Sequence, residues 1–231
     1  MDFWRTRVSE TEAVAKARLY DAFAFSGKAL SSGKRLELLD VLAQGERTVD
    51  ALAKATGLNL TTASAHLQTL KQTGFVATRR DGVRIHYRLA GHDVAELLAL
   101  LRKVAEQHQT NVPAARTAYL GPDSAPEITR DQLQTRANTG SLLLLDVRPL
   151  DEYLAGHIPG AISIPVDELA QRITELPEHL EIIVYCRGEY CVFAYNAVRL
   201  LTNHGRRAIR LNDGMLEWRL ANLPITAGEH P

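Results

Sequence analysis

The sequence of 231 residues contains only two cysteines, carries no formal net charge and has no long apolar run. Two cysteines cannot form the several disulfides on which small secreted domains depend. A membrane-spanning helix needs about 18 or more consecutive apolar residues, and neither such a stretch nor a charged-then-apolar leader is present. We therefore expect a cytoplasmic protein with no membrane segment.

Length and composition leave room for two globular domains, since 45% of the residues are hydrophobic. Basic residues slightly exceed acidic ones before residue 111, and the reverse holds from residue 126 onward. Between these regions lies a stretch with several prolines and little apolar periodicity, which indicates a linker. We predict domains at 1–110 and 126–231, joined by a linker at 111–125.

The first domain is predicted to be mostly helical, because apolar residues recur at helical spacing between glycines. An Asp-Gly pair at residues 81–82 then indicates a hairpin. A short helix, a glycine turn, a second helix and a basic hairpin are typical of a winged helix-turn-helix. The predicted helices are 10–25, 35–43, 50–56, 60–73 and 92–110, and the predicted strands are 75–78 and 83–89.

The helix predicted at 60–73 is the candidate for DNA recognition. Ala63, Leu67 and Leu70 fall on its inner face. Its outer face carries hydroxyl, amide and imidazole groups that suit base edges, and the hairpin carries arginines that suit phosphates. A solvated polar face without a partner is the alternative. The candidate DNA-contacting residues are Thr61, Thr62, Ser64, His66, Gln68, Arg79, Arg80 and Arg84.

The recognition helix and wing of the ArsR/SmtB family of bacterial repressors resemble residues 58–71, LNLTTASAHLQTLK, and residues 74–89, GFVATRRDGVRIHYRL. The resemblance covers about residues 10–110. It implies a homodimer that binds double-stranded operator DNA and releases it when an inducer binds. The helix at 10–25, which has one wide apolar face, is then either a core helix or half of the dimer contact.

Metal-sensing members of that family use a cysteine pair on the third helix, or an Asp-x-His pair with His-x-x-Glu on the last helix. Residues 49–55, VDALAKA, contain no cysteine. Asp93 is followed two positions later by Ala95, and His108 is followed three positions later by Asn111. We therefore expect neither a metal site nor a cofactor.

From residue 127 the pattern changes to alternating strands and helices, which is typical of a parallel α/β sheet covered on both faces. Ligands of such sheets bind beyond the carboxyl ends of the strands. Asp146 and Arg148 lie at one such end and Cys186 at another, so these side chains are expected to converge. The predicted strands are 142–147, 182–185 and 207–211, and the predicted helices are 130–137, 166–176 and 192–204.

Cys186 is the candidate reactive residue, because it lies between a predicted strand and a predicted helix. The loop is expected to curl at Gly188 and to aim its amides inward, which stabilises an anion. A cysteine pKa of about 8.5 then falls toward neutrality, and the same nest fits a persulfide. The carboxylate of Glu189 is expected to point outward. The predicted anion-binding loop is Arg187, Gly188, Glu189, Tyr190 and Cys191.

A rhodanese domain resembles three stretches within residues 126–225: LLDVRPLDEYLAGHIPGAISIP, the strand ending in Tyr185-Cys186, and LNDGMLEWRLANLPI. The resemblance implies sulfur transfer. The loop cysteine takes a sulfane sulfur from a donor such as thiosulfate or a persulfide, holds it as Cys–S–S⁻ and passes it to a nucleophile. Asp146 and Arg148 match the family's Asp-Val-Arg motif and are expected to form a structural ion pair, while His157 is expected to pack within its loop.

Together the halves predict a mostly helical α+β winged helix-turn-helix domain followed by an α/β rhodanese-like domain with a parallel sheet. The hypothesis is a homodimeric repressor that senses reactive sulfur. Sulfur loads onto Cys186, and Cys191, a possible resolving thiol, attacks to give a disulfide or a sulfur-bridged pair that weakens operator binding. Cys191 is alternatively a second sulfur acceptor or a small packing residue.

Two other functions stay open. One is a sulfurtransferase whose winged domain serves dimerisation or recruitment. The other is a metalloid-responsive repressor in which Cys186 and Cys191 ligate the inducer. Phosphatase or arsenate chemistry ranks below these, because the fifth and sixth positions after Cys186 are Cys191 and Val192 rather than an arginine that clamps the oxyanion.

Overall fold

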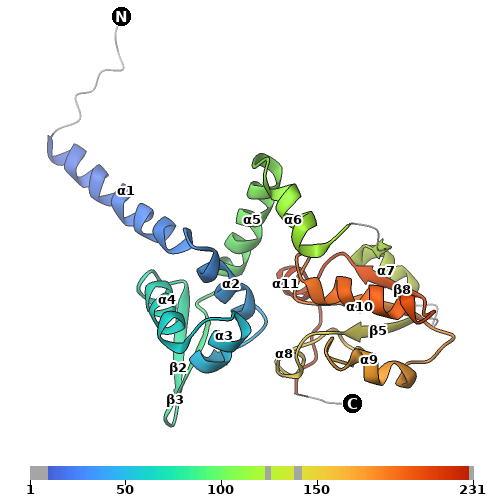
Figure 1. The fold of residues 1–231 in the computed structure, drawn as a ribbon. Coiled ribbons are helices and arrows are strands. Elements are labelled where there is room, and N and C mark those ends of the chain that lie inside the picture. The colour runs from blue at the N-terminus through green and yellow to red at the C-terminus, as the bar shows by residue number, and fades with distance from the viewer. Residues whose placement is uncertain (1–9, 123–125, 138–141, 229–231) are drawn as a thin grey trace, which may run out of the picture.

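The computed structural model describes residues 10–122, 126–137 and 142–228 and shows two folded halves joined through helix α6 (Figure 1). The front half has an antiparallel sheet with strand order β1-β3-β2. Its elements are α1 (Glu10–Leu30), α2 (Gly33–Leu42), β1 (Arg47–Thr48), α3 (Val49–Ala55), α4 (Leu60–Gln72), β2 (Val76–Asp81), β3 (Arg84–Leu89) and α5 (His92–His108).

A winged helix-turn-helix is confirmed in this half. Helices α3 and α4 flank a turn in which Gly57 has a φ of 63°, a conformation that favours glycine. The Asn59 side chain accepts a 2.8 Å hydrogen bond from the Thr62 amide and caps α4. Strand β1 was not predicted, and it adds a short third strand beside β3. The core is formed by buried leucines of α2, α3 and α4: Leu38, Leu39, Leu52, Leu67 and Leu70.

Helix α1 extends away from the rest of the front half (Figure 1). Among its described side chains, only that of Ala29, near the end of the helix, is buried. The apolar side chains of its first four turns are exposed, so the core-helix interpretation of this segment does not hold within one chain. The exposed large residues are Val14, Leu19, Tyr20, Phe23 and Phe25.

The segment predicted to be a linker at 111–125 contains α6 (Val112–Leu120). Pro113 favours a loop in the sequence, but it lies in the first turn of the helix, where a missing amide hydrogen breaks no helical bond. Gly121 then ends the helix with a φ of 83°. Leu120 is buried and its carbonyl accepts a bond from Arg199 of the second half, so α6 packs against that half.

The second half is a five-stranded sheet with order β4-β8-β7-β5-β6 in which every strand pair is parallel. Alternate side chains of the strands face the two layers of helices. One layer contains α7, α8 and α11, and the other contains α9 and α10. The elements are β4 (Glu127–Ile128), α7 (Arg130–Ala137), β5 (Leu142–Asp146), α8 (Leu150–Leu154), β6 (Ile162–Ser163), α9 (Leu169–Arg172), η1 (Ile173–Glu175), β7 (Glu181–Tyr185), α10 (Val192–Asn203), β8 (Ala208–Leu211) and α11 (Met215–Leu220).

Within the described ranges, no helix combines the length and the apolar character needed to cross a membrane.

Candidate functional site

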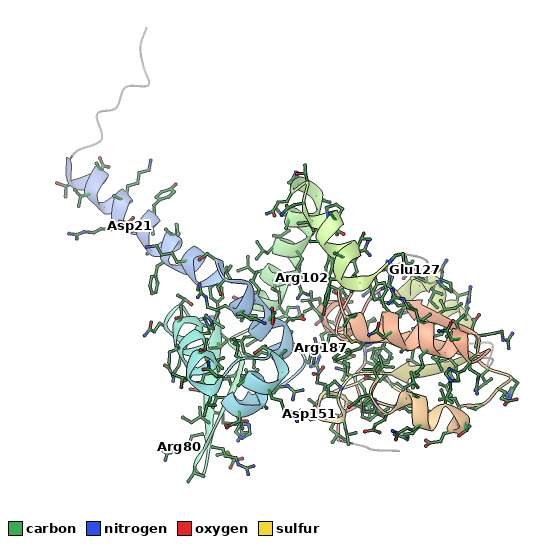
Figure 2. All side chains as sticks on the ribbon, in the orientation of Figure 1. Asp21, Arg80, Arg102, Glu127, Asp151 and Arg187 are labelled. Atoms are coloured by element: carbon green, nitrogen blue, oxygen red, sulfur yellow. A yellow bond between two sulfur atoms is a disulfide. The ribbon has the colours of Figure 1, made fainter. Side chains whose placement is uncertain are left out.

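The proposed DNA-contacting face lies on α4 and on the hairpin of β2 and β3. Thr61 and the three wing arginines are exposed, and Thr62, Ser64 and His66 are partly exposed. Figure 2 shows Arg80 at the lower end of the hairpin, away from the second half. Gln68 and Arg79 have partners inside the domain, since Gln68 donates to the Tyr87 hydroxyl at 3.2 Å and Arg79 pairs with Glu46 at 2.9 Å.

The sulfur loop, residues 186–191, connects the end of β7 to the start of α10. Cys186 and Cys191 form a disulfide, with their Cα atoms 6.1 Å apart. Cys186 is 2% exposed and packs in the apolar cluster that contains Val147 and Ala194. Cys191 is partly exposed and occupies the N-cap of α10. In this oxidised form, an external reagent therefore has access to Cys191 before Cys186.

The amides of residues 187–190 donate to no protein acceptor within the part of the chain that the structure describes. Only the Cys191 amide does so in this loop, to the Gly188 carbonyl at 3.1 Å. Uncommitted amides at the start of a helix are suited to an anion.

Gly188 does not have the left-handed conformation that a curl at this residue would need. Its lack of a side chain serves a close approach instead. A Cβ atom at Gly188 would lie 3.1 and 3.2 Å from the two carboxylate oxygens of Glu217, and a Cβ atom at Gly214 would overlap the Gly188 nitrogen. The loop therefore packs against the start of α11 with no room between the two backbones.

Helix α11 also holds the loop by hydrogen bonds. The Met215 and Leu216 amides donate to the carbonyls of Cys186 and Arg187, at 3.0 and 2.9 Å. Burial raises the pKa of Glu217 to about 7, against the opposing effect of a 2.8 Å hydrogen bond from the Gly214 amide. A carboxyl group with a near-neutral pKa thus lies directly beside the sulfur loop.

Arg187 points from the loop toward the front half (Figure 2) and binds Glu152 of α8 in a fork of hydrogen bonds between 2.7 and 3.1 Å. Burial opposes the charge of Arg187, but Glu152 more than offsets this and raises the pKa of the guanidinium. The Glu152 carboxylate also forms an ion pair with Arg47 of β1, at 3.3 Å. Arg47 also pairs with Asp151.

Glu189 and Tyr190 connect the loop to helices before the second half. The Glu189 carboxylate, which was expected to point outward, pairs with Arg116 of α6 at 3.4 Å. The Tyr190 hydroxyl donates to Glu106 of α5 at 2.8 Å, and the guanidinium of Arg102 lies over the tyrosine ring. Burial, assisted by the Glu106 contact, raises the pKa of Tyr190.

The predicted ion pair of Asp146 and Arg148 is present, with both side chains 0% exposed and contacts from 2.5 to 3.1 Å. It lies beside the loop, since Asp146 is in register with Tyr185. Arg148 also donates to Gln44 of the front half at 3.2 Å. His157 stacks on Tyr153 and bonds its carbonyl, which fits the predicted packing role.

Sequence reasoning missed the residues that other elements bring to the loop: Gln44, Arg47, Glu106, Arg116, Glu152 and Glu217. Gln44 and Arg47 flank a Gly-Glu pair that looks like a solvated turn after a helix. No local signal marks them, because their partners are more than 100 residues away along the chain. Among the described residues, no group of three or more histidines, cysteines or carboxylates could hold a metal ion.

Known proteins resemble this chain in both halves. Residues 32–78 match the model described as bacterial regulatory protein, arsR family, and residues 129–221 match the rhodanese-like domain. The HTH-type transcriptional regulator Rv0324 of Mycobacterium tuberculosis is 56% identical over 92% of this chain and 94% of that protein. A sulfurtransferase of Allochromatium vinosum is 33% identical over 45% of this chain and 96% of that protein.

Among solved structures, a homodimeric winged helix-turn-helix DNA-binding domain from Mycobacterium bovis is 58% identical. The match covers 42% of this chain and 89% of that one, with a TM-score of 0.39.

Proposed function

The chain belongs to the arsR family of transcriptional regulators and carries a rhodanese domain, and from this we propose that it regulates transcription in response to reactive sulfur. Cys186 takes up sulfane sulfur, and the loop that holds it acts on the winged domain. The observation that carries the proposal is the sulfur loop itself: it contains both cysteines of the chain, and its Tyr190 hydroxyl and Arg187 carbonyl contact the front half.

Sulfur uptake begins from the reduced loop. A thiol attacks the more accessible sulfur, that of Cys191, which releases Cys186 as a thiolate and leaves a mixed disulfide on Cys191. A second thiol then attacks the first, which leaves as an external disulfide and frees the Cys191 thiol. The thiolate attacks the outer sulfur of thiosulfate, forming Cys–S–S⁻ while the sulfur–sulfur bond of the donor breaks and sulfite leaves with the electron pair. The uncommitted amides of residues 187, 189 and 190 support the new anion.

Cys191 closes the cycle as the resolving thiol. The Cys191 thiol gives its proton to the outer sulfur of the Cys186 persulfide and attacks the inner sulfur, which forms the disulfide and expels hydrosulfide. The 6.1 Å separation of the two Cα atoms supports this step, since it lies in the range that a disulfide needs. The loop therefore has an open, sulfur-loaded form and a closed, disulfide form.

The regulatory output is binding of a homodimer to operator DNA. The exposed apolar side chains of α1 support the dimer, because a contiguous apolar surface of this kind marks a protein interface. The exposed hydroxyls of α4 and the wing arginines Arg80 and Arg84 support DNA contact. Loading or closing the loop shifts its contacts with the front half and so weakens operator binding.

Replacing Cys186 tests the proposal. On exposure to thiosulfate or polysulfide, the reduced wild-type protein should gain one sulfur atom, mapped to Cys186, and should then lose it as the disulfide forms, in a time course of intact-mass measurements. Cys186→Ser should gain no sulfur atom and should bind operator DNA with the same affinity before and after treatment. Cys191→Ser is the matched control, and it should keep the added sulfur because no second thiol expels it. Equal DNA affinity for untreated and sulfur-treated wild-type protein would contradict the proposal.

A second candidate function is sulfurtransfer for its own sake, with the winged domain serving dimerisation or recruitment. The similarity to the A. vinosum sulfurtransferase over the whole of the second half favours it. Rapid turnover of thiosulfate with cyanide, together with no sequence-specific DNA binding, would select this function over regulation.

A further inference from the structure

The two halves meet at a surface in which the front half supplies buried polar groups. Gln44 is 0% exposed and Arg47 is 8% exposed, and both follow helix α2 of the front half. Between them, a Cβ atom on Gly45 would lie 2.7 Å from the Cβ atom of Ala155. This turn is therefore inserted closely against the rhodanese half, and its side chains reach groups that support the sulfur loop.

The contacts run in an unbroken series from the winged domain to the residue after Cys186. Arg47 pairs with Glu152 at 3.3 Å, and Glu152 accepts the forked bonds of Arg187. On the other side of the same turn, the Gln44 amide donates to the Arg187 carbonyl at 3.4 Å, while its oxygen accepts from Arg148 at 3.2 Å. Both the side chain and the backbone of Arg187 thus depend on the front half.

Glu152 is the centre of this series because it is 1% exposed and shared by two guanidinium groups, one from each half. A buried carboxylate without adequate pairing is strongly unfavourable. If Arg47 is removed, Glu152 loses one of the cations that face it, and the region beside Cys186 becomes more negative. That change disfavours a thiolate or persulfide anion at Cys186.

We infer that Arg47, a residue of the winged domain, is a positioning residue of the sulfur site: it holds Glu152, which holds Arg187 beside Cys186. The inference rests on the proposed sulfur chemistry of Cys186. It means that the rhodanese site is complete only when the winged domain is docked against it.

The other end of the series reaches the wing. Arg47 lies on β1, which pairs with wing strand β3 at Tyr87, and its neighbour Glu46 pairs with Arg79 of β2. A ligand on the wing and a sulfur on Cys186 therefore act on ion pairs made by two adjacent residues, Glu46 and Arg47. Because such coupling is reciprocal, operator DNA should change the reactivity of Cys186 through Arg47.

The test uses the full chain in a Cys191→Ser background, so that Cys186 is the one thiol and cannot form the internal disulfide. The parent, Arg47→Met, Arg47→Lys and Arg88→Met proteins are compared. Arg88 is the matched control, since it is an exposed arginine of β3 outside the series. The readouts are the pH profile of Cys186 alkylation by iodoacetamide and the rate of sulfur uptake from thiosulfate.

Arg47→Met should shift the alkylation profile by about one unit toward higher pH and should slow alkylation at neutral pH by up to about tenfold. Arg47→Lys keeps the charge and should restore most of the parent profile, which a purely structural role for Arg47 would not predict. Arg88→Met should match the parent. If Arg47→Met proves unfolded by circular dichroism, Arg47→Gln compared with Arg47→Lys decides the question in its place.

An Arg47→Met profile equal to that of the parent would overturn the inference, and so would the same shift in Arg88→Met. The alkylation readout does not depend on sulfur uptake. Failure of the parent to take up sulfur would therefore count against the proposed function alone, while the alkylation profiles still decide the role of Arg47.

Discussion

The DNA-contacting face and the sulfur loop are both functional candidates of the sequence, yet their side chains are held very differently. On α4 and the wing, the candidate residues are largely exposed, and the few internal contacts stay within the domain. In the sulfur loop, Arg187, Glu189 and Tyr190 each contact a residue from another element. One region is available to a partner outside the chain, and the other is already bound to partners inside it.

This difference follows from what each region must do. A surface that binds DNA needs unoccupied donors, because phosphates and base edges supply the missing partners. A loop that reports a chemical change must be connected, because a change that alters no contact cannot shift an equilibrium elsewhere. Substitutions in the sulfur loop should therefore change folding and sulfur chemistry. Substitutions on the DNA-contacting face should change DNA affinity alone.

The largest effect is expected from Gly214→Ala. The new Cβ atom would overlap the Gly188 nitrogen, so the loop or α11 must move. Overpacking of this kind destabilises by about 1–3 kcal/mol, measured by urea unfolding, and sulfur uptake at Cys186 should fall with it. Gly33→Ala is the control, since a Cβ atom there meets nothing within 4 Å. An equal loss of stability in both variants would show that the sulfur loop is not packed more tightly than the start of α2.

A smaller effect, confined to DNA binding, is expected from Arg80→Ala and Arg84→Ala. Each removes one candidate phosphate contact, so affinity should fall several-fold and the salt dependence should decrease by about one unit of slope per arginine. Fluorescence anisotropy over a salt series measures both. The unfolding midpoint should not change, and Lys103→Ala, at an exposed position of α5, should leave the affinity unaltered. A loss of stability in the arginine variants would show that the wing is not a free surface.

The last effect concerns pH. The pKa of Glu217 is about 7 in the folded chain, against an ordinary value of 4.5. Between these values the folded protein keeps a proton that the unfolded chain has lost. The contribution of Glu217 to the free energy of unfolding is thus complete below about 4.5 and is lost as the pH rises through about 7.

Glu217→Gln should therefore remove part of the fall in stability seen on going from about pH 5 to about pH 8, measured by urea unfolding at each pH. Glu175→Gln is a useful contrast, because its hydrogen bond to Arg172 lowers the pKa of that exposed carboxyl. If the stability difference between the wild-type and Glu217→Gln proteins does not vary with pH, the Glu217 carboxylate lies outside this buried environment.

The two regions also differ in how far the sequence could predict them. Thr61 and Arg84 belong to a helix and a hairpin whose local patterns are sufficient to place them, and α4 begins at Leu60 as expected. Cys186 and the pair of Asp146 and Arg148 were likewise placed by strand ends. These features depend on neighbours in the sequence.

The partners of the loop could not be predicted in the same way. Arg47 contacts Glu152, and Tyr190 contacts Glu106, across long sequence separations that periodicity does not encode. Pro113 indicates a linker in the sequence because proline interrupts helices, but here it lies in the first turn of α6. The structure thus adds mainly the contacts between halves.

Helix α1 gives the proposed dimer one further consequence. If its aromatic side chains, Tyr20, Phe23 and Phe25, are covered by a second copy, folding and association become a single equilibrium governed by mass action. Dilution would then lower operator binding by separating the two copies, and it would also expose the apolar side chains of α1 to water. The abundance of the protein in the cell would help to set how long each molecule survives.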